Sequence, residues 1–68
     1  MKLINCEWNE HTNKYMRTWL ADDDGDIAAG FDSESSEGSA IVVVSSGSTY
    51  MKNTDGKWQK VGTTEVIE

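Results

Sequence analysis

Three aspartates in an acidic segment have the spacing that comes nearest to a metal site. Asp22, Asp24 and Asp26 stand at alternate positions, as the first three ligands of a helix–loop–helix calcium site do. The later positions differ, because Ile27 stands where that loop needs glycine and Ser33 stands where it needs a bidentate glutamate. We therefore expect a solvated acidic turn with no dedicated metal site. The alternative is weak, millimolar attraction of a divalent cation by the clustered carboxylates.

The other reactive side chains lack the partners that catalysis requires. His11 lies beside Glu10 in a predicted turn, with no nucleophile at a recognisable spacing. Cys6 alternates with Ile4 and Trp8 on one face of a predicted strand, which predicts a buried and inert thiol. We expect a protein that is not an enzyme and that carries no cofactor.

Large aromatic side chains are frequent for a chain of 68 residues, which has three Trp, two Tyr and one Phe. Aromatic side chains can form an exposed face on which sugars or bases stack, or they can fill the core of a small β domain. Trp19, Tyr50 and Trp58 are the residues that we expect to act as core or contact residues.

The charge balance excludes two classes of partner. Twelve acidic and six basic residues give a net charge of −6, which disfavours binding to nucleic acid or to an anionic membrane surface. The longest apolar run, Ile41 to Val44, is far shorter than a membrane helix requires, and the first residues show no signal peptide.

A chain of this length forms one domain with a small core. Such domains often need a disulfide, a metal or a partner subunit, and a single cysteine and a single histidine exclude an internal disulfide and a four-ligand zinc site. We therefore expect a homo-oligomer, and the lone cysteine fits a reducing compartment.

The first part of the chain predicts a β-hairpin over residues 1–21. Lys2 to Trp8 and Lys14 to Ala21 alternate as strands do, and the polar residues between them form the turn. Trp19 then shares a face with Tyr15 and Arg17, and Met16, Thr18 and Leu20 lie on the opposite face. We also expect a cross-strand contact between Trp8 and Trp19.

Residues 22–39 read as an acidic and serine-rich connection. Asp24 or Asp26 could cap a short helical turn over 27–29, and Ile27 or Phe31 could plug the sheet. The segment Asp32 to Gly38 has almost no apolar residue and reads as a mobile surface loop.

Residues 40–68 predict a second hairpin unit. Ile41 to Val44 lacks alternation, which favours a strand covered on both faces by a loop, a tail or another subunit. Ser48 to Lys52 and Lys57 to Val61 flank an Asp55-Gly56 turn, and Val66-Ile67 could add a short edge strand. The predicted fold is all-β: a small antiparallel sheet or two packed β-hairpins with one short helical turn or plug.

Most of the chain resembles small proteins encoded in the structural modules of tailed phages and prophages. The resemblance lies in the Gly38-Ser39 step before the apolar strand, in the Tyr50-Met51 strand, and in Lys57-Trp58 after a polar turn; the opening from Cys6 to Asp24 is similar too. A proline often precedes the Gly-Ser step in those proteins, and its absence here leaves the preceding loop freer.

The resemblance implies a non-enzymatic virion or assembly protein that acts through protein–protein contacts. Its partners would be other virion or assembly proteins, and it would be found in the virion or in the cytoplasm of the bacterial host. The alternative is a small binding module that uses an exposed aromatic face for a glycan or a host protein.

Overall fold

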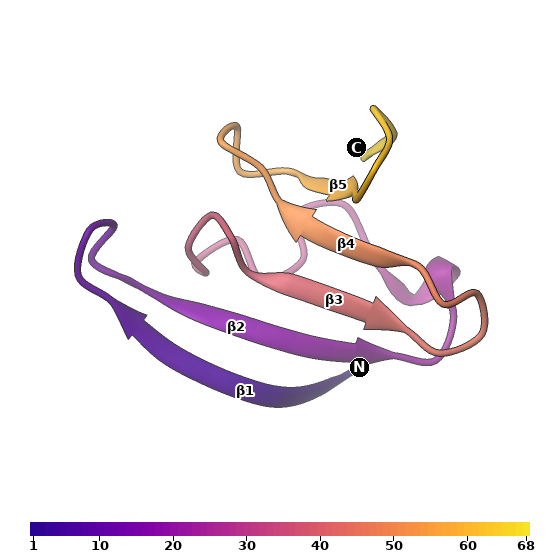
Figure 1. Ribbon diagram of the computed structural model, residues 1–68, viewed down its shortest axis with the longest axis horizontal. Coiled ribbons are helices and arrows are strands. Elements are labelled where there is room, and N and C mark those ends of the chain that lie inside the picture. Colours follow the sequence, from indigo (N-terminus) through magenta and orange to yellow (C-terminus); the bar gives the residue numbers. More distant parts are fainter.

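The computed structural model describes all 68 residues as one sheet of six strands whose spatial order follows the chain (Figure 1). The strands are β1 (Lys2–Asn9), β2 (Lys14–Ala21), β3 (Ala40–Val43), β4 (Thr49–Lys52), β5 (Trp58–Lys60) and β6 (Val66–Ile67). All neighbours are antiparallel except β2 and β3, which are parallel. The all-β prediction is confirmed. Of the two predicted forms the chain adopts the single sheet, because the two hairpin units join edge to edge through β2 and β3.

The β1–β2 hairpin forms where alternation predicts it, but its aromatic pair is a different one. Asn9 pairs with Lys14, and Asn13 takes a positive φ of 54° in the turn. This register places Trp8 opposite Tyr15, with ring centroids 5.0 Å apart in an edge-to-face arrangement. The expected contact between Trp8 and Trp19 is wrong, because Trp19 lies farther from the turn and pairs with Leu3.

An irregularity in β1 changes which of its residues share a face. The register shifts between Leu3 and Asn5, so that Ile4 is the extra residue of a bulge. Leu3, Cys6 and Trp8 therefore lie on the same face as their partners Trp19, Arg17 and Tyr15. The expectation that Ile4, Cys6 and Trp8 share a face is wrong for Ile4, since alternation cannot reveal a single inserted residue.

Residues 22–39 form a crossover that connects β2 to the parallel strand β3. The crossover lies against one face of the sheet, which we call the inner face (Figure 1). It begins with a 3-10 turn, η1 (Asp24–Asp26), whose N-cap is Asp23. The helical turn thus precedes the expected one over 27–29, because Asp23 and Asp26 form a reciprocal capping box.

The last four strands form a meander. The Asp55-Gly56 step makes the predicted turn between β4 and β5, with Gly56 at a φ of +77° and its N–H donating to the Asn53 carbonyl. Val66 and Ile67 pair with β5 as the short edge strand that the sequence indicates. No helix of the chain is long and apolar enough to cross a membrane.

The hydrophobic core lies between the inner face and the crossover. It consists of Ala21, Ile27, Ile41, Val43, Tyr50 and Trp58, with Trp19, Phe31 and Ile67 packed against it. Ile27 and Phe31 therefore cover the sheet as the sequence predicts. Within one chain the run from Ile41 to Val44 is covered on one face only, because Ile41 and Val43 are fully buried whereas Val42 is 37% and Val44 is 62% exposed. The second cover is therefore no loop or tail of this chain, and a cover by another subunit stays a prediction.

Candidate interaction surface

Asp32 anchors the crossover to the inner face of the sheet. Its carboxylate accepts hydrogen bonds from the Arg17 guanidinium at 2.7 Å and from the Trp19 indole N–H at 2.8 Å. Both donors stand on β2, two residues apart, so they project from the same face of the strand. Since the Asp32 side chain is only 8% exposed, the ion pair with Arg17 is screened less than a surface pair would be.

Lys52 makes a second anchor from β4. Its ammonium group donates to the main-chain carbonyls of Asp32 and Ser35 and to the Ser35 hydroxyl. Burial lowers the pKa of Lys52 below its usual value, and the nearby Asp32 carboxylate opposes that shift. Because three oxygen acceptors satisfy the three ammonium donors, this buried lysine holds the chain in place and offers no free amine.

The segment from Asp32 to Gly38 is consequently not the free loop that its composition suggests. Ser35 and Ser36 are buried, the Ser36 hydroxyl lies 2.8 Å from that of Thr12, and the Trp58 indole N–H donates to the Phe31 carbonyl at 2.8 Å. No buried side-chain nitrogen or oxygen lacks a hydrogen-bond partner. The prediction of a mobile loop is wrong, because the hydroxyl groups of the buried Ser35 and Ser36 have hydrogen-bond partners in other parts of the fold.

The acidic turn uses its carboxylates to tie chain segments together. Asp24 accepts a hydrogen bond from the Tyr50 hydroxyl at 2.8 Å, and Asp23 accepts one from the Ser45 hydroxyl at 2.9 Å. Hydrogen bonds from Ser46 and Tyr50 lower the pKa of Asp24, and the bond to Asp24 raises the pKa of Tyr50. No three His, Cys, Asp or Glu side chains are grouped so that they could hold a metal ion.

The opposite face of the sheet, which we call the outer face, has no covering segment. Met51 on β4 pairs with Ala40 and Gln59, and Val42 pairs with Leu20 and Thr49, so these side chains lie on the same side of the sheet. Hydrogen bonds from Val44 N–H to Ala21 and from Val61 N–H to Thr49 continue the pairing past the strand ends. The outer face comprises Met16, Thr18, Leu20, Ala40, Val42, Val44, Thr49, Met51, Gln59 and Val61.

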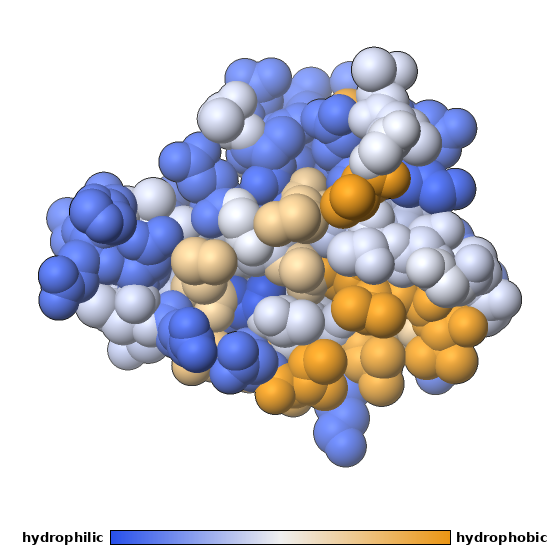
Figure 2. Space-filling view, viewed as in Figure 1, coloured by the Kyte–Doolittle hydropathy of each residue, from blue (hydrophilic) through white to orange (hydrophobic).

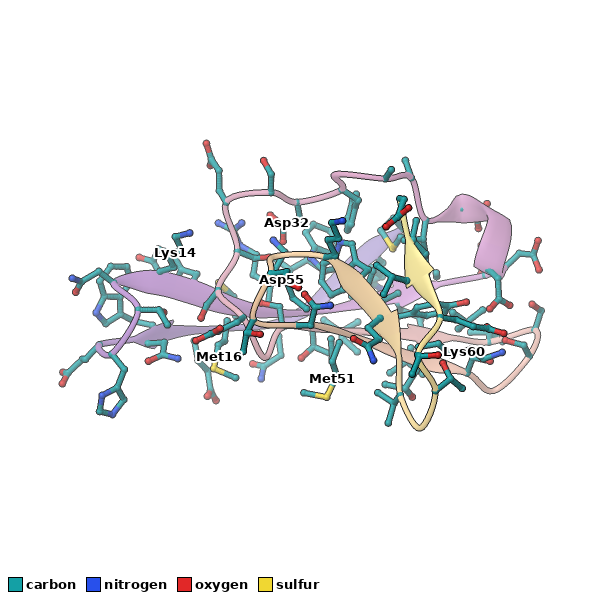
Figure 3. All side chains as sticks on the ribbon, turned by 90° about the horizontal axis from the view of Figure 1, so that it is seen from above. Lys14, Met16, Asp32, Met51, Asp55 and Lys60 are labelled. Carbon is teal, nitrogen blue, oxygen red and sulfur yellow. The ribbon has the colours of Figure 1, made fainter.

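Seven of these ten residues are apolar and the other three are uncharged, although charged residues make up 26% of the chain. The charged side chains on this side lie at its border: Lys2 and Glu7 on β1 and Lys60 beside Val61. Met16 and Met51 project from the side opposite to Asp32 (Figure 3). The most apolar side chains on this side of the molecule gather toward one end of β1, β2 and β3, and paler and hydrophilic side chains lie between and around them (Figure 2). Contiguous exposed apolar side chains are one feature that protein-binding sites share.

Two depressions on the surface differ in chemistry. The first, of about 250 Å³, has an entirely polar lining that includes Lys14 and Lys52, and it lies between the hairpin turns and the crossover. The second, of about 200 Å³, lies beside the outer-face residues Met51, Gln59 and Val61, and its lining is mostly polar, with Asn53, Lys60 and Thr63. The outer face is therefore hollowed at one side, between β4 and the turn after β5.

The residues predicted as core or contact residues all lie on the inner side. Trp58 and Tyr50 belong to the core, and Trp19 packs against Phe31 with ring centroids 5.0 Å apart. They form no exposed aromatic face. The exposed aromatic residues are Trp8 and Tyr15, on the part of the hairpin that the crossover does not reach.

Cys6 is exposed, contrary to the prediction of a buried thiol. Alternation correctly places it on the same side as Trp8, but burial requires a cover, and β1 lies at the edge of the sheet beyond the crossover. The sequence reasoning also missed Val42 and Met51 as surface residues. The signal that could have identified them is their alternation with Ile41 and Tyr50, whose side chains are buried on the inner face.

Comparison with known proteins adds no relative: no family model, no curated protein and no solved structure matches this chain.

Proposed function

We propose that this protein is a non-enzymatic structural or assembly component that binds other protein subunits through the outer face of its sheet. The observation that carries the proposal is the uncharged apolar outer face, which is left uncovered while the inner face is buried by the crossover. A monomer would gain solubility from charges on such a surface, and this acidic chain places none there.

The rigidity of the sheet supports a binding role. The crossover is attached through Asp32 and Lys52 by hydrogen bonds to β2 and β4, so the outer face is presented on a preformed scaffold. A preformed surface loses little conformational entropy when it binds, which favours association. The flexible thioether side chains of Met16 and Met51 can adapt to the partner's shape.

We place this activity in a phage or prophage particle, on the strength of the resemblance that runs from Cys6 to Asp24 and from Gly38 to Trp58. The expected partners are virion or assembly proteins, in the virion or in the host cytoplasm. The test is mass spectrometry of particles purified after induction of the lysogen. The tryptic peptide from Thr18 to Lys52 should appear at a fixed ratio to the major capsid protein.

A matched pair of variants ties that test to the outer face. Val42→Lys places a charge in the middle of the outer face, and Leu3→Lys places the same charge on an exposed position of β1, on the inner side. We expect Val42→Lys to lower incorporation by about tenfold or more, whereas Leu3→Lys is incorporated normally. Because Val42→Lys adds a tryptic site within the Thr18–Lys52 peptide, the three chains are compared through the peptide from Val61 to Glu68, which they share. Equal incorporation of both variants would refute binding through the outer face.

A second function, binding of a glycan or host protein, is favoured by one observation. Trp8 and Tyr15 form an exposed edge-to-face pair near the tip of the hairpin. Stacking of a sugar on this pair would change the fluorescence of Trp8, since Trp19 and Trp58 lie against or within the core. Titration with a panel of oligosaccharides should then produce a change that Trp8→Leu abolishes, and an unchanged response in that variant would exclude the pair.

A further inference from the structure

The structure also suggests which subunit covers the outer face. We propose that it is a second copy of this chain, and that two sheets stack by their outer faces into a β-sandwich. This inference rests on the proposed function, because it assigns an occupant to the same surface. In this sandwich the two outer faces meet at the centre, and each crossover lies on the side of its sheet that faces away from the partner.

The distribution of charge favours a second copy. Each chain carries a net charge of −6, and seven of its twelve acidic residues lie between residues 22 and 39, on the crossover. Two copies therefore repel each other when they approach by their inner sides. Contact between the outer faces brings only the border charges of Lys2, Glu7 and Lys60 to the interface and keeps the two acidic crossovers farthest apart.

The charges that flank the outer face lie at its border. Lys2 and Glu7 on β1 pair with Leu20 and Met16, so they stand on the same side of the sheet, one strand beyond the patch. An uncharged apolar centre with charges at the rim is the usual anatomy of a protein interface. A basic partner would instead be attracted to the crossover, where the acidic residues are concentrated.

The dimensions of the face fit a small, reversible dimer. The molecule measures 32 Å by 24 Å across this face, and the rectangle of those sides has an area close to the roughly 800 Å² that each partner buries in a standard interface. Because the apolar patch fills only part of the rectangle, the interface would lie at the small end of the range for specific protein interfaces. Sheets packed face to face lie about 10 Å apart with nearly aligned strands, which interdigitated Val and Met side chains can fill.

Val42 lies near the middle of such an interface, because β3 and its neighbours β2 and β4 carry the centre of the patch. Two-fold symmetry brings the same residues of both copies close together. Val42→Lys would thus place two ammonium groups in one dry contact. The lysine makes the net charge less negative, so a loss of the dimer could not be attributed to stronger overall repulsion.

The experiment is sedimentation equilibrium of the full chain from about 1 μM to about 500 μM, with Val42→Lys and Leu3→Lys beside the wild type and circular dichroism to verify folding. We expect the wild type and Leu3→Lys to dimerise with similar dissociation constants, and Val42→Lys to remain monomeric. Dilution of ¹⁵N-labelled wild-type protein should shift the amide signals of the outer face and leave those of the crossover unchanged. These shifts provide the test if Val42→Lys does not fold.

A wild type that stays monomeric throughout this range would overturn the second copy as the occupant. So would a dimer that Leu3→Lys dissolves and Val42→Lys preserves, since that result places the contact at β1. Neither result would refute the proposed function, which fails only if Val42→Lys and Leu3→Lys are incorporated equally into particles. A second copy can therefore be excluded while binding through the outer face is retained.

Discussion

The inner and outer faces of the sheet are built from alternate residues of the same strands, yet they differ in how their side chains are stabilised. On the inner face, Ile41 and Tyr50 are buried beneath the crossover, and even the ammonium of Lys52 is held by protein oxygens. On the outer face, their neighbours Val42 and Met51 pack against adjacent side chains but remain 37% and 42% exposed. Folding of one chain therefore buries the inner face much more completely than the outer face.

Substitutions at two adjacent residues of β3 test most directly how the burial of the two faces differs. Ile41→Ala removes fully buried atoms and should lower the free energy of unfolding by about 2–5 kcal/mol. Val42→Ala should change it by less than about 1 kcal/mol in dilute protein, because that side chain is already partly hydrated. A domain of this length has only about 3–10 kcal/mol in total, so Ile41→Ala should be largely unfolded in mild denaturant. Urea unfolding of both variants measures the values, and equal losses would contradict the assignment of the two faces.

The anchor at Asp32 gives the next largest effect. Asp32→Asn keeps the shape and tolerates the positive φ of 47°, but it removes the charge that Arg17 and the Trp19 indole contact. We expect the free energy of unfolding to fall by about 1–3 kcal/mol. Glu34→Gln is the control, since it removes one charge from an exposed position of the same crossover and should change stability by less than about 0.5 kcal/mol. Similar losses in both variants would show that the crossover responds to net charge and not to the anchor.

These anchors are also where the sequence was least informative. Alternation predicted β2, β4 and the opposite faces of Tyr50 and Met51, and the Asp-Gly step predicted the turn before β5, because each of these signals is local. The composition of the segment from Asp32 to Gly38 predicted a mobile loop. Ser35 and Ser36 are buried because Lys52 on β4 and Thr12 in the β1–β2 turn contact them from distant parts of the chain, and no local pattern carries that information.

The parallel pairing of β2 with β3 could not be predicted from the sequence either. The two hairpin units were expected to form an antiparallel sheet or to pack as separate hairpins, whereas Trp19 pairs with Ile41 in a parallel register across the crossover. This arrangement explains why the apolar run from Ile41 to Val44 has one open side. The run was predicted to be covered on both faces by a loop, a tail or another subunit, and within one chain only the crossover provides a cover.

The acid stability of the fold tests the link between the crossover and β4. Hydrogen bonds from Ser46 and Tyr50 lower the pKa of Asp24 in the folded state, so the unfolded chain binds a proton there more readily. The resulting stability is present above the ordinary carboxyl pKa and is lost as the pH falls through the lower pKa of the folded state. Tyr50→Phe removes one of the two bonds and should make the loss of stability below pH 4 shallower.

Tyr15→Phe is the matched control for that measurement, because Tyr15 is exposed on the hairpin and its hydroxyl does not contact Asp24. Unfolding by urea at a series of acidic pH values should give a wild-type slope for Tyr15→Phe and a smaller slope for Tyr50→Phe. If both variants keep the wild-type slope, the bond to Asp24 makes no contribution to acid stability.

Substitution of Cys6 should have the smallest effect on stability, and the reactivity of its thiol tests how far the crossover extends over the inner face. Its thiol lies on the inner side of β1 but beyond the crossover, so Cys6→Ser should change the free energy of unfolding by less than about 0.5 kcal/mol. A thiol reagent should modify native Cys6 at a rate within about tenfold of that in denaturant.

In a Cys6→Ser background, Ala21→Cys places a thiol at a fully buried inner position, and reaction there should be slowed by at least about a hundredfold, since it requires opening of the structure. Thr49→Cys in the same background lies on the outer face, and its reaction should slow as the protein concentration rises, while that of Cys6 in the wild type should not. Slowing at Cys6 instead would place the contact between copies at β1, and slow modification of Cys6 at every concentration would show that the crossover covers the edge strand as well.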